Sequence, residues 1–133
     1  YYLRRNVALN RADVEVVKGD VLDGGALELP EPLDLIVCNP PYLTKEDMEH
    51  LQAEVSYEPA TALYGDTDGL RFYRVIAEQW FGRLRPGGTI AFEIGIGQEG
   101  DVSDILYWNG YQNVCTYQDV CGIIRVITAE RPL

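Results

Sequence analysis

Apolar residues occur along this chain in short blocks that predict strands and helices in alternation. Residues 1 to 10, YYLRRNVALN, have the spacing of the second half of an amphipathic helix. The run VEVVK at 14 to 18 predicts a strand that ends in a Gly-Asp turn. Residues 33 to 38, LDLIVC, are apolar without interruption after Asp34, which predicts a strand covered on both faces of a sheet.

The middle of the chain predicts two helices separated by an irregular segment. Thr44 is placed to cap a polar helix, KEDMEHLQAEV at 45 to 55, with acidic residues in its first turn. Residues 56 to 69 are rich in turn-forming residues and predict an irregular connection. A longer helix begins at Asp68 or Gly69. Its apolar face, with a spacing of about 3.6 residues, is formed by Phe72, Ile76, Trp80 and Leu84.

The last third of the chain predicts a strand at 89 to 94, a helix at 101 to 110, and two further strands at 113 to 118 and 123 to 130. Only about four residues separate the last two strands, which is too few for a parallel crossover, so we expect an antiparallel hairpin. The alternation of elements predicts an α/β fold with helices on both faces of a mostly parallel sheet.

Composition narrows the class of protein. The chain has 133 residues, 47% of them hydrophobic and 24% charged, which predicts one soluble domain over residues 1–133. The formal net charge of −10 repels phosphate backbones, so strong direct binding to nucleic acid is not expected. No apolar run approaches the ~20 residues of a membrane span and no leader pattern is present, so we expect no membrane association and a cytoplasmic location.

The cysteines and the histidine receive no chemical role. Cys38, Cys115 and Cys121 lie in apolar surroundings without a C-x-x-C pair, which predicts three buried, reduced thiols in a cytosolic protein and no metal site. His50 is the single histidine and lies in a polar helical stretch, so it is not assigned as a ligand or a base.

One glycine-rich segment matches a nucleotide-binding pattern. Residues 95 to 100, GIGQEG, fit G-x-G-x-x-G between a predicted strand and a predicted helix, and Asp119 follows at about the 20-residue spacing of a dinucleotide site. However, only one further strand follows Asp119, and Glu99 and Asp101 would repel a pyrophosphate at the helix N-terminus. A glycine-rich turn is the favoured interpretation, with a dinucleotide site as the alternative.

The residues directly after the strand at 33 to 38 carry the strongest chemical signal. They read Asn39-Pro40-Pro41-Tyr42, and the two prolines hold the backbone extended with its carbonyls displayed. The Asn39 side-chain oxygen and the Pro40 carbonyl can each accept a hydrogen from one planar NH2 group, on which the Tyr42 ring can stack. Two fixed acceptors orient that nitrogen and draw its lone pair out of conjugation, which favours transfer of a methyl group to nitrogen.

This motif resembles the Asn-Pro-Pro-Tyr motif of S-adenosylmethionine-dependent amino methyltransferases, which have a Rossmann-like fold. The HemK/PrmC branch is the most similar, since its resemblance extends to residues 19 to 24, 39 to 76, 84 to 98 and 119 to 127. Members of that branch methylate the side-chain amide of the glutamine in the Gly-Gly-Gln motif of peptide chain release factors. The resemblance implies the C-terminal part of the catalytic domain of a protein-(glutamine-N5) methyltransferase, with S-adenosylmethionine as cofactor and release factors as partners.

The resemblance also implies roles for individual residues. Asn39 and Pro40 would hold the target amide nitrogen, and Pro41 and Tyr42 would complete the substrate site, with Tyr42 packed against the amide plane. Asn39 would in addition lie near the methionine part of the cofactor.

Two further positions follow from the same resemblance. Asp20 matches the acidic position that contacts the adenine amino group, with the backbone of Val21 beside it. Glu58-Pro59 matches a characteristic pair to which no mechanism is assigned.

The chain departs from the family pattern at its beginning. The family's main cofactor loop and the first two strands of its sheet would lie upstream of Tyr1, so the strand at 14 to 18 has no neighbour with which to pair. We therefore expect these 133 residues alone to bind the cofactor weakly and to be inactive, with self-association through open sheet edges as a further expectation.

Two alternatives stay open. The same acceptors fit an exocyclic amine of adenine or guanine, so a nucleic-acid amino methyltransferase is the second reading, although the negative charge argues against it. The third is an inactive, truncated binding module in which the motif is retained without methyl transfer.

Overall fold

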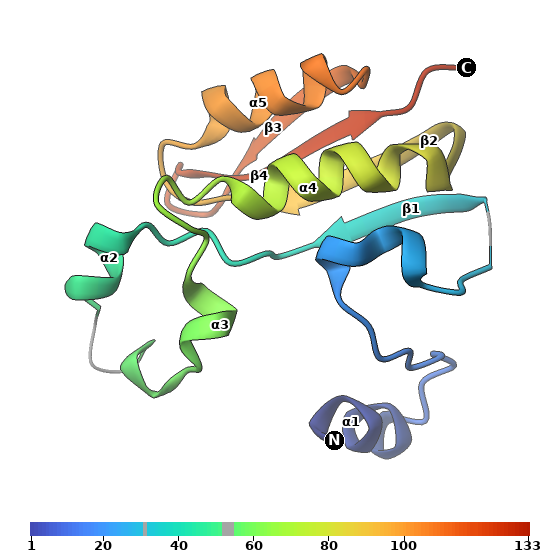
Figure 1. Cartoon of the computed structure of the whole chain (residues 1–133), viewed down its shortest axis with the longest axis horizontal. Helices are drawn as coiled ribbons and strands as arrows, with labels where there is room; N and C mark the ends of the chain where they lie inside the picture. Colours follow the sequence, from blue (N-terminus) through green and yellow to red (C-terminus); the bar gives the residue numbers. More distant parts are fainter. Residues whose placement is uncertain (31, 52–54) are drawn as a thin grey trace.

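The computed structural model of the chain describes residues 1–30, 32–51 and 55–133. Its centre is a four-stranded sheet with the order β1-β2-β4-β3 (Figure 1). The strands are β1 (Leu33–Cys38), β2 (Leu84–Glu93), β3 (Gln112–Gln118) and β4 (Ile124–Glu130). β1 runs parallel to β2, whereas β4 is antiparallel to both β2 and β3. The predicted α/β class, the strand at 33 to 38 and the C-terminal hairpin are confirmed. The described sheet is mixed rather than mostly parallel, because two of its three strand pairings are antiparallel.

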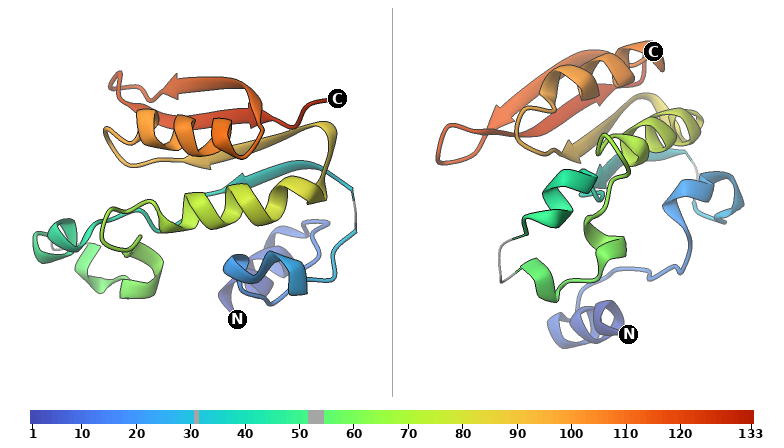
Figure 2. Two further views of the ribbon diagram at one scale, coloured as in Figure 1. Left: turned by 45° about the horizontal axis from the view of Figure 1, so that its top comes forward. Right: turned by 60° about the vertical axis from the view of Figure 1, so that its left-hand side comes forward.

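Two helices cover one face of this sheet. They are α4 (Arg71–Trp80) and α5 (Glu99–Trp108), and they lie side by side in front of the strands in Figures 1 and 2. Alternate residues of β2 and β4 point toward them, as the two-residue period of a strand requires. The fully buried side chains between helices and sheet include Tyr73, Ile76, Ile90, Phe92, Val102, Leu106 and Ile127.

The prediction that both faces of the sheet are covered is wrong for the residues that the structure describes. Ile36 and Cys38 of β1 are half-buried, but the intervening Leu35 and Val37 are 55% and 73% exposed. Both helices that pack on the sheet lie on the opposite side, so the apolar residues of the outer face of β1 stay in contact with solvent.

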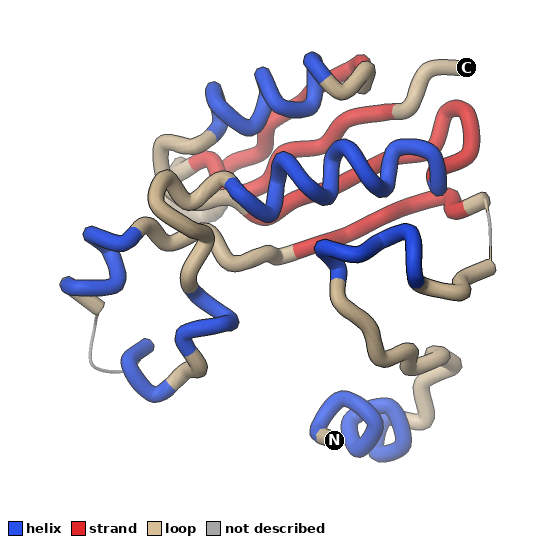
Figure 3. Tube along the Cα trace, in the orientation of Figure 1, coloured by secondary structure: helices blue, strands red, loops and turns tan. Residues whose placement is uncertain are grey.

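The predicted strand at 14 to 18 does not form. Residues 12 to 20 are an irregular connection between α1 (Tyr2–Asn10) and the short 3-10 helix η1 (Val21–Ala26), as Figure 3 shows. Val14 and Val17 are exposed. An isolated strand has no ladder partner for its backbone groups, so these groups are better satisfied by water. The helix expected at the N-terminus is confirmed, although none of its residues is buried.

The segment η1 is attached to the end of α4. The indole nitrogen of Trp80 donates to the carbonyl of Val21 at 3.0 Å, and the backbone nitrogen of Gly24 donates to the Gln79 side chain at 2.9 Å. A Cβ at Gly24 would lie 2.6 Å from the indole nitrogen, so only glycine permits this close packing. The chain is thereby held against α4 before it enters β1.

Short helices project from the carboxyl end of β1, on the left of Figure 1. They are α2 (Lys45–Glu49), η2 (Val55–Tyr57) and α3 (Ala60–Leu63). Thr44 caps α2 as predicted, and it forms a capping box with Asp47. The helix ends earlier than predicted, at Glu49, and residues 52 to 54 of the predicted helix lie outside the described residues.

The helix α4 begins two to three residues later than predicted, at Arg71, and a turn of 3-10 helix, η3 (Phe81–Arg83), continues it. β2 begins earlier than predicted, at Leu84, because the Pro-Gly-Gly segment stays in the sheet as an irregularity in the pairing with β1. Both differences concern ends of elements, where local sequence is least decisive.

The prediction of three buried thiols is wrong. Cys38 is half-buried, but Cys115 on β3 and Cys121 in the hairpin turn are exposed. Both lie in the C-terminal hairpin, and β3 is an edge strand.

Within residues 1–30, 32–51 and 55–133, no helix combines the length and the apolar character that crossing a membrane requires. No group of three or more potential metal ligands occurs among those residues.

Candidate active site at the carboxyl edge of the sheet

The four residues predicted for the substrate site, Asn39 to Tyr42, lie where β1 ends, at the carboxyl edge of the sheet. Pro40 is buried, Pro41 and Tyr42 are half-buried, and Asn39 is exposed. All four line one pocket of about 460 Å³. Its other walls come from the α2 to α3 region and include Asp47, His50, Leu51, Val55, Glu58 and Leu63. The structure thus brings the predicted acceptors together at a cavity, and it places Glu58 on the same wall.

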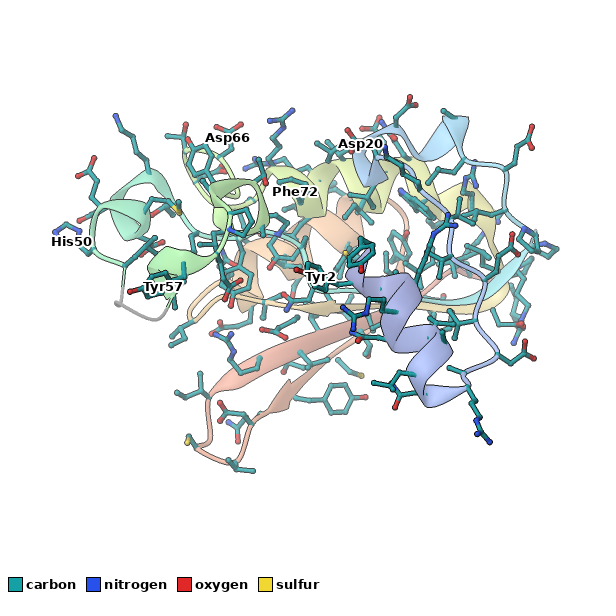
Figure 4. All side chains as sticks on the ribbon, turned by 90° about the horizontal axis from the view of Figure 1, so that it is seen from below. Tyr2, Asp20, His50, Tyr57, Asp66 and Phe72 are labelled. Carbon is teal, nitrogen blue, oxygen red and sulfur yellow. The ribbon has the colours of Figure 1, made fainter. Side chains whose placement is uncertain are left out.

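Figure 4 shows His50 and Tyr57 at the far end of this region, away from the sheet. The ring nitrogen Nδ1 of His50 lies 3.0 Å from the Glu46 carbonyl, which is a contact within α2 and its cap. His50, to which the sequence assigned no role, nevertheless lines the candidate pocket.

The backbone after the motif is held by a segment that lies about twenty residues further along the chain. Leu43 and Tyr64 form an isolated parallel bridge, with hydrogen bonds from Leu43 N to the Leu63 carbonyl (2.9 Å) and from Gly65 N to the Leu43 carbonyl (2.8 Å). The segment predicted as irregular therefore returns to the motif and braces it. The local sequence gives no indication of this pairing.

Two glycines of that segment permit the close approach. A Cβ at Gly65 would lie 2.7 Å from the Tyr42 Cα atom and 2.8 Å from the Pro41 carbonyl. At Gly69, which has a φ of +71°, a Cβ would lie 2.3 Å from the Tyr42 carbonyl oxygen. All three distances are shorter than a real Cβ contact, so both positions require glycine as long as the motif stays where it is.

Gln98 connects the glycine-rich turn to the motif. Its Nε2 donates to the Tyr42 carbonyl at 3.2 Å, and its Oε1 accepts from Gly95 N at 2.8 Å. The Tyr73 hydroxyl donates to the Glu93 carbonyl at 2.9 Å beside it. Burial raises the pKa of Tyr73, so this hydroxyl stays protonated and remains a donor.

The same contacts decide the interpretation of the glycine pattern at 95 to 100. The amide of Gly95 is already bonded to the Gln98 side chain, and a Cβ there would lie 2.7 Å from Oε1. The turn is therefore filled by a residue of the pattern itself, and carboxylates of Glu99 and Asp101 stand in the first turn of α5. This supports the glycine-rich turn over a dinucleotide site.

The Tyr42 side chain points across the edge of the sheet toward β4. Arg125 Nη2 donates to the Tyr42 hydroxyl at 2.9 Å and contacts Glu93 Oε1 at 3.2 Å. The guanidinium carbon lies 5.6 Å from the centre of the Tyr42 ring. Gln98 and Arg125 are functional candidates that the sequence reasoning missed, because neither lies near the motif in the chain.

The two residues predicted for the adenine end of the cofactor lie elsewhere. The Asp20 carboxylate accepts from Leu22 N at 2.9 Å as the cap of η1, and the Val21 carbonyl accepts from Trp80. Val21 lines a separate pocket with Leu27 and Trp80. The structure therefore does not bring this pair against Asn39, and its cofactor role stays a prediction.

Comparison with known proteins gives the family context. The chain is 40% identical over 125 residues to a release factor glutamine methyltransferase of Clostridium acetobutylicum, which covers 92% of the chain and 44% of that protein. It is 44% identical over 119 residues to the corresponding protein of Clostridium botulinum, with 89% and 42% coverage. A third, from Geobacter sulfurreducens, is 41% identical over 130 residues. The predicted family resemblance is confirmed: this chain matches part of the release factor glutamine methyltransferases.

The chain spans less than half the length of these release factor glutamine methyltransferases. No protein-family model matches it. Among solved structures, a methyltransferase from Pyrococcus furiosus superimposes with a TM-score of 0.67 at 20% identity, covering 99% of the chain and 57% of that protein. TrmN from Thermus thermophilus gives 0.57 at 18% identity, with 98% and 32% coverage. These structures show that the fold is that of a methyltransferase, of which this chain holds a part.

Proposed function

We propose that this chain is the substrate-binding part of an S-adenosylmethionine-dependent methyltransferase that modifies the glutamine side-chain amide in the Gly-Gly-Gln motif of peptide chain release factors. The observation that carries the proposal is the placement of Asn39 to Tyr42 on one pocket at the carboxyl edge of the sheet, where α/β folds bind ligands. The names of the relatives support the choice of substrate. A protein that modifies release factors would act in the cytoplasm, so a cytoplasmic location is part of the proposal.

The chemistry requires an amide nitrogen to act as a nucleophile. In this proposal the Asn39 side-chain oxygen and the Pro40 carbonyl each accept one hydrogen of the substrate NH2 group. Pro40 is buried and Pro41 is half-buried, so the Pro40 carbonyl is held in a fixed place, whereas Asn39 is exposed and accessible to a substrate. Fixed acceptors act mainly in the transition state, because they stabilise the positive charge that develops on the nitrogen.

S-adenosylmethionine supplies the methyl group when it is bound. Asn39 and Pro40 would hold the amide nitrogen that receives this methyl group in exchange for one proton, and the open pocket would let that proton pass to solvent. Cys38 directly precedes the motif, and burial raises the pKa of its thiol. Burial therefore favours the neutral form of this thiol.

The residues present fit the cofactor in part. The Asp20 carboxylate is exposed, and the cap of η1 uses one of its oxygens in a single hydrogen bond, so it retains acceptor capacity for an adenine amino group. Asn39 lines the pocket proposed for the substrate, and the family resemblance implies that it would also lie near the methionine part of the cofactor. Substitution of Asp20 by Asn is expected to weaken cofactor affinity without changing the maximal rate.

The test uses the complete gene product with radiolabelled S-adenosylmethionine. A release factor and a DNA and RNA mixture are offered in separate reactions, each with the wild-type protein and with Asn39→Ala. Label on the release factor that is lost in the variant supports the proposal. Label on nucleic acid would replace it with the amino methyltransferase alternative, and no label on any substrate would favour the inactive binding module.

A further inference from the structure

The hydrogen bond between Arg125 and Tyr42 joins the last strand of the sheet to the candidate substrate site. We propose that Arg125 is a positioning residue, which fixes the Tyr42 ring in the orientation that the amide substrate requires. This inference rests on the proposed function and extends it to a residue 83 positions away from the motif in the chain.

The backbone of Arg125 is itself well placed for this role. Its carbonyl accepts from Ile94 N at 2.9 Å, immediately after the pairing of β2 with β4 ends at Glu93 and Val126. Side chains two residues apart on a strand share a face, so Arg125 lies on the same face as the buried Ile127. It therefore extends the covered face of the sheet to the carboxyl edge, where Tyr42 arrives from β1.

The contact determines the direction of the ring. An arginine side chain has only donors and is always charged, so the Tyr42 oxygen is the acceptor and the bond persists at all ordinary pH values. At the other end of the residue, Gln98 holds the Tyr42 carbonyl. A Cβ at Gly95 would lie 3.1 Å from Tyr42 Cδ2, so the ring also packs closely along its edge. The glycine-rich turn after β2 thus restrains the backbone and the edge of the ring, and β4 restrains the hydroxyl.

Glu93 completes the arrangement. Its carboxylate lies 3.2 Å from the Arg125 Nη2 atom, and the two side chains are 39% and 25% exposed. Ion pairs with this much solvent contact contribute little to folding. Glu93 therefore mainly orients the guanidinium and offsets its charge. Loss of Arg125 should accordingly disturb the site more than the fold.

A double-mutant cycle tests the proposal in the complete gene product. Arg125→Gln is expected to lower kcat for release-factor methylation by about tenfold to a hundredfold, the scale of a small misplacement of reacting groups, with KM for S-adenosylmethionine nearly unchanged. Tyr42→Phe, which keeps the ring but lacks the hydroxyl, should cause a similar loss. If Arg125 acts through that hydroxyl, the double variant is no worse than either single variant.

Two controls separate this role from a purely structural one. Arg85→Gln removes another partly exposed ion pair, with Asp34 at the opposite end of β1, and should leave kcat unchanged. Arg125→Lys retains the charge but not the planar fork, and should restore only part of the rate. Additive losses in the double variant would overturn the proposal, as would a wild-type kcat in Arg125→Gln.

A second readout does not depend on the reaction. In protein with 13C-labelled tyrosine rings, the Tyr42 signal is identified by its loss in Tyr42→Phe. It should shift in Arg125→Gln and stay in place in Arg85→Gln. Failure of the wild-type protein to label a release factor would contradict the proposed function, whereas an unchanged Tyr42 signal in Arg125→Gln would contradict the positioning role.

Discussion

The side-chain amide of Gln98 donates a hydrogen bond to the backbone carbonyl of Tyr42 at 3.2 Å, across 56 positions of the chain. The same side chain accepts from Gly95 N, so one residue ties the turn after β2 to the extended segment after β1. β1 and β2 are neighbouring parallel strands, and the hydrogen bonds of Gln98 fix their carboxyl ends relative to each other. The two segments that would form the floor of the site therefore behave as one piece.

Two substitutions of Gln98 should distinguish the effect of its hydrogen bond to Tyr42 from the effect of its hydrogen bond to Gly95. Gln98→Ala loses both and is expected to lower the free energy of unfolding by about 1–3 kcal/mol, the usual cost of unpaired, partly buried backbone groups. Gln98→Glu keeps the acceptor for Gly95 but has no donor for Tyr42. Both variants should methylate more slowly, whereas urea unfolding should show the larger loss for the variant that leaves Gly95 unpaired. Full activity in Gln98→Glu would show that the Tyr42 carbonyl needs no donor.

Asn39→Ala removes one of the two proposed acceptors of the substrate nitrogen. We expect a barrier higher by about 3 kcal/mol, or a rate lower by about a hundredfold or more, with little change in stability because Asn39 is exposed. Single-turnover methylation of a release factor measures the effect. Asn6→Ala, at another exposed asparagine on α1, is the control and should leave the rate unchanged.

Three glycines distinguish crowding from backbone strain. Gly69→Ala combines a φ of +71° with a Cβ placed 2.3 Å from the Tyr42 carbonyl oxygen, so it should destabilise the protein by roughly 3 kcal/mol or more. Gly97→Ala has a φ of +81° but open space, and should cost only about 1–2 kcal/mol. Gly100→Ala lies in the first turns of α5 with no neighbour within 4 Å and should stabilise by about 0.5–1 kcal/mol.

Thermal unfolding of the three glycine variants measures this order. Equal losses of stability in Gly69→Ala and Gly97→Ala would mean that crowding against Tyr42 adds nothing to the cost of backbone strain. Methylation rates give an independent check, since only Gly69 lies against the motif.

The thiols should react in two classes that depend on pH. Burial raises the pKa of Cys38, so its reactive thiolate form appears only at a higher pH than for an ordinary thiol. Cys115 and Cys121 are exposed and open to reagent. With iodoacetamide at pH 8, mass spectrometry should show two fast alkylations and one slow one, and the slow site should gain rate as the pH is raised to 10. Rapid labelling of Cys38 at pH 8 would contradict its placement.

Much of the fold follows from local sequence. The strand at 33 to 38 was predicted with its observed bounds, because an apolar run that ends in two prolines has few alternatives. The hairpin follows from a connection too short for a crossover. The strand at 14 to 18 did not form, since a strand depends on a neighbour that its own residues do not describe. The exposed face of β1 could not be predicted for the same reason. Apolar side chains indicate a preference for burial, but they do not show whether another element packs over them.

The residues of the candidate site also fall into those that the sequence predicts and those that only the structure shows. Asn39 to Tyr42 could be selected from sequence because their effect on the backbone is local. Gln98 and Arg125 could not, since their hydrogen bonds to Tyr42 span 56 and 83 positions and leave no periodic pattern. The glycines at 65 and 69 are a weak sequence signal for close backbone contacts. The segment that they contact, Pro41 and Tyr42, can be identified only from the structure.

The C-terminal hairpin carries none of the proposed acceptors, yet its strand β4 holds the hydroxyl of Tyr42. The C-terminal hairpin is thus joined to the proposed substrate site, and movement of the hairpin against β2 would be transmitted to the Tyr42 ring. Engineering that loosens this hairpin, by a tag or an insertion at its turn, would therefore disturb the proposed substrate site while the motif itself remained intact.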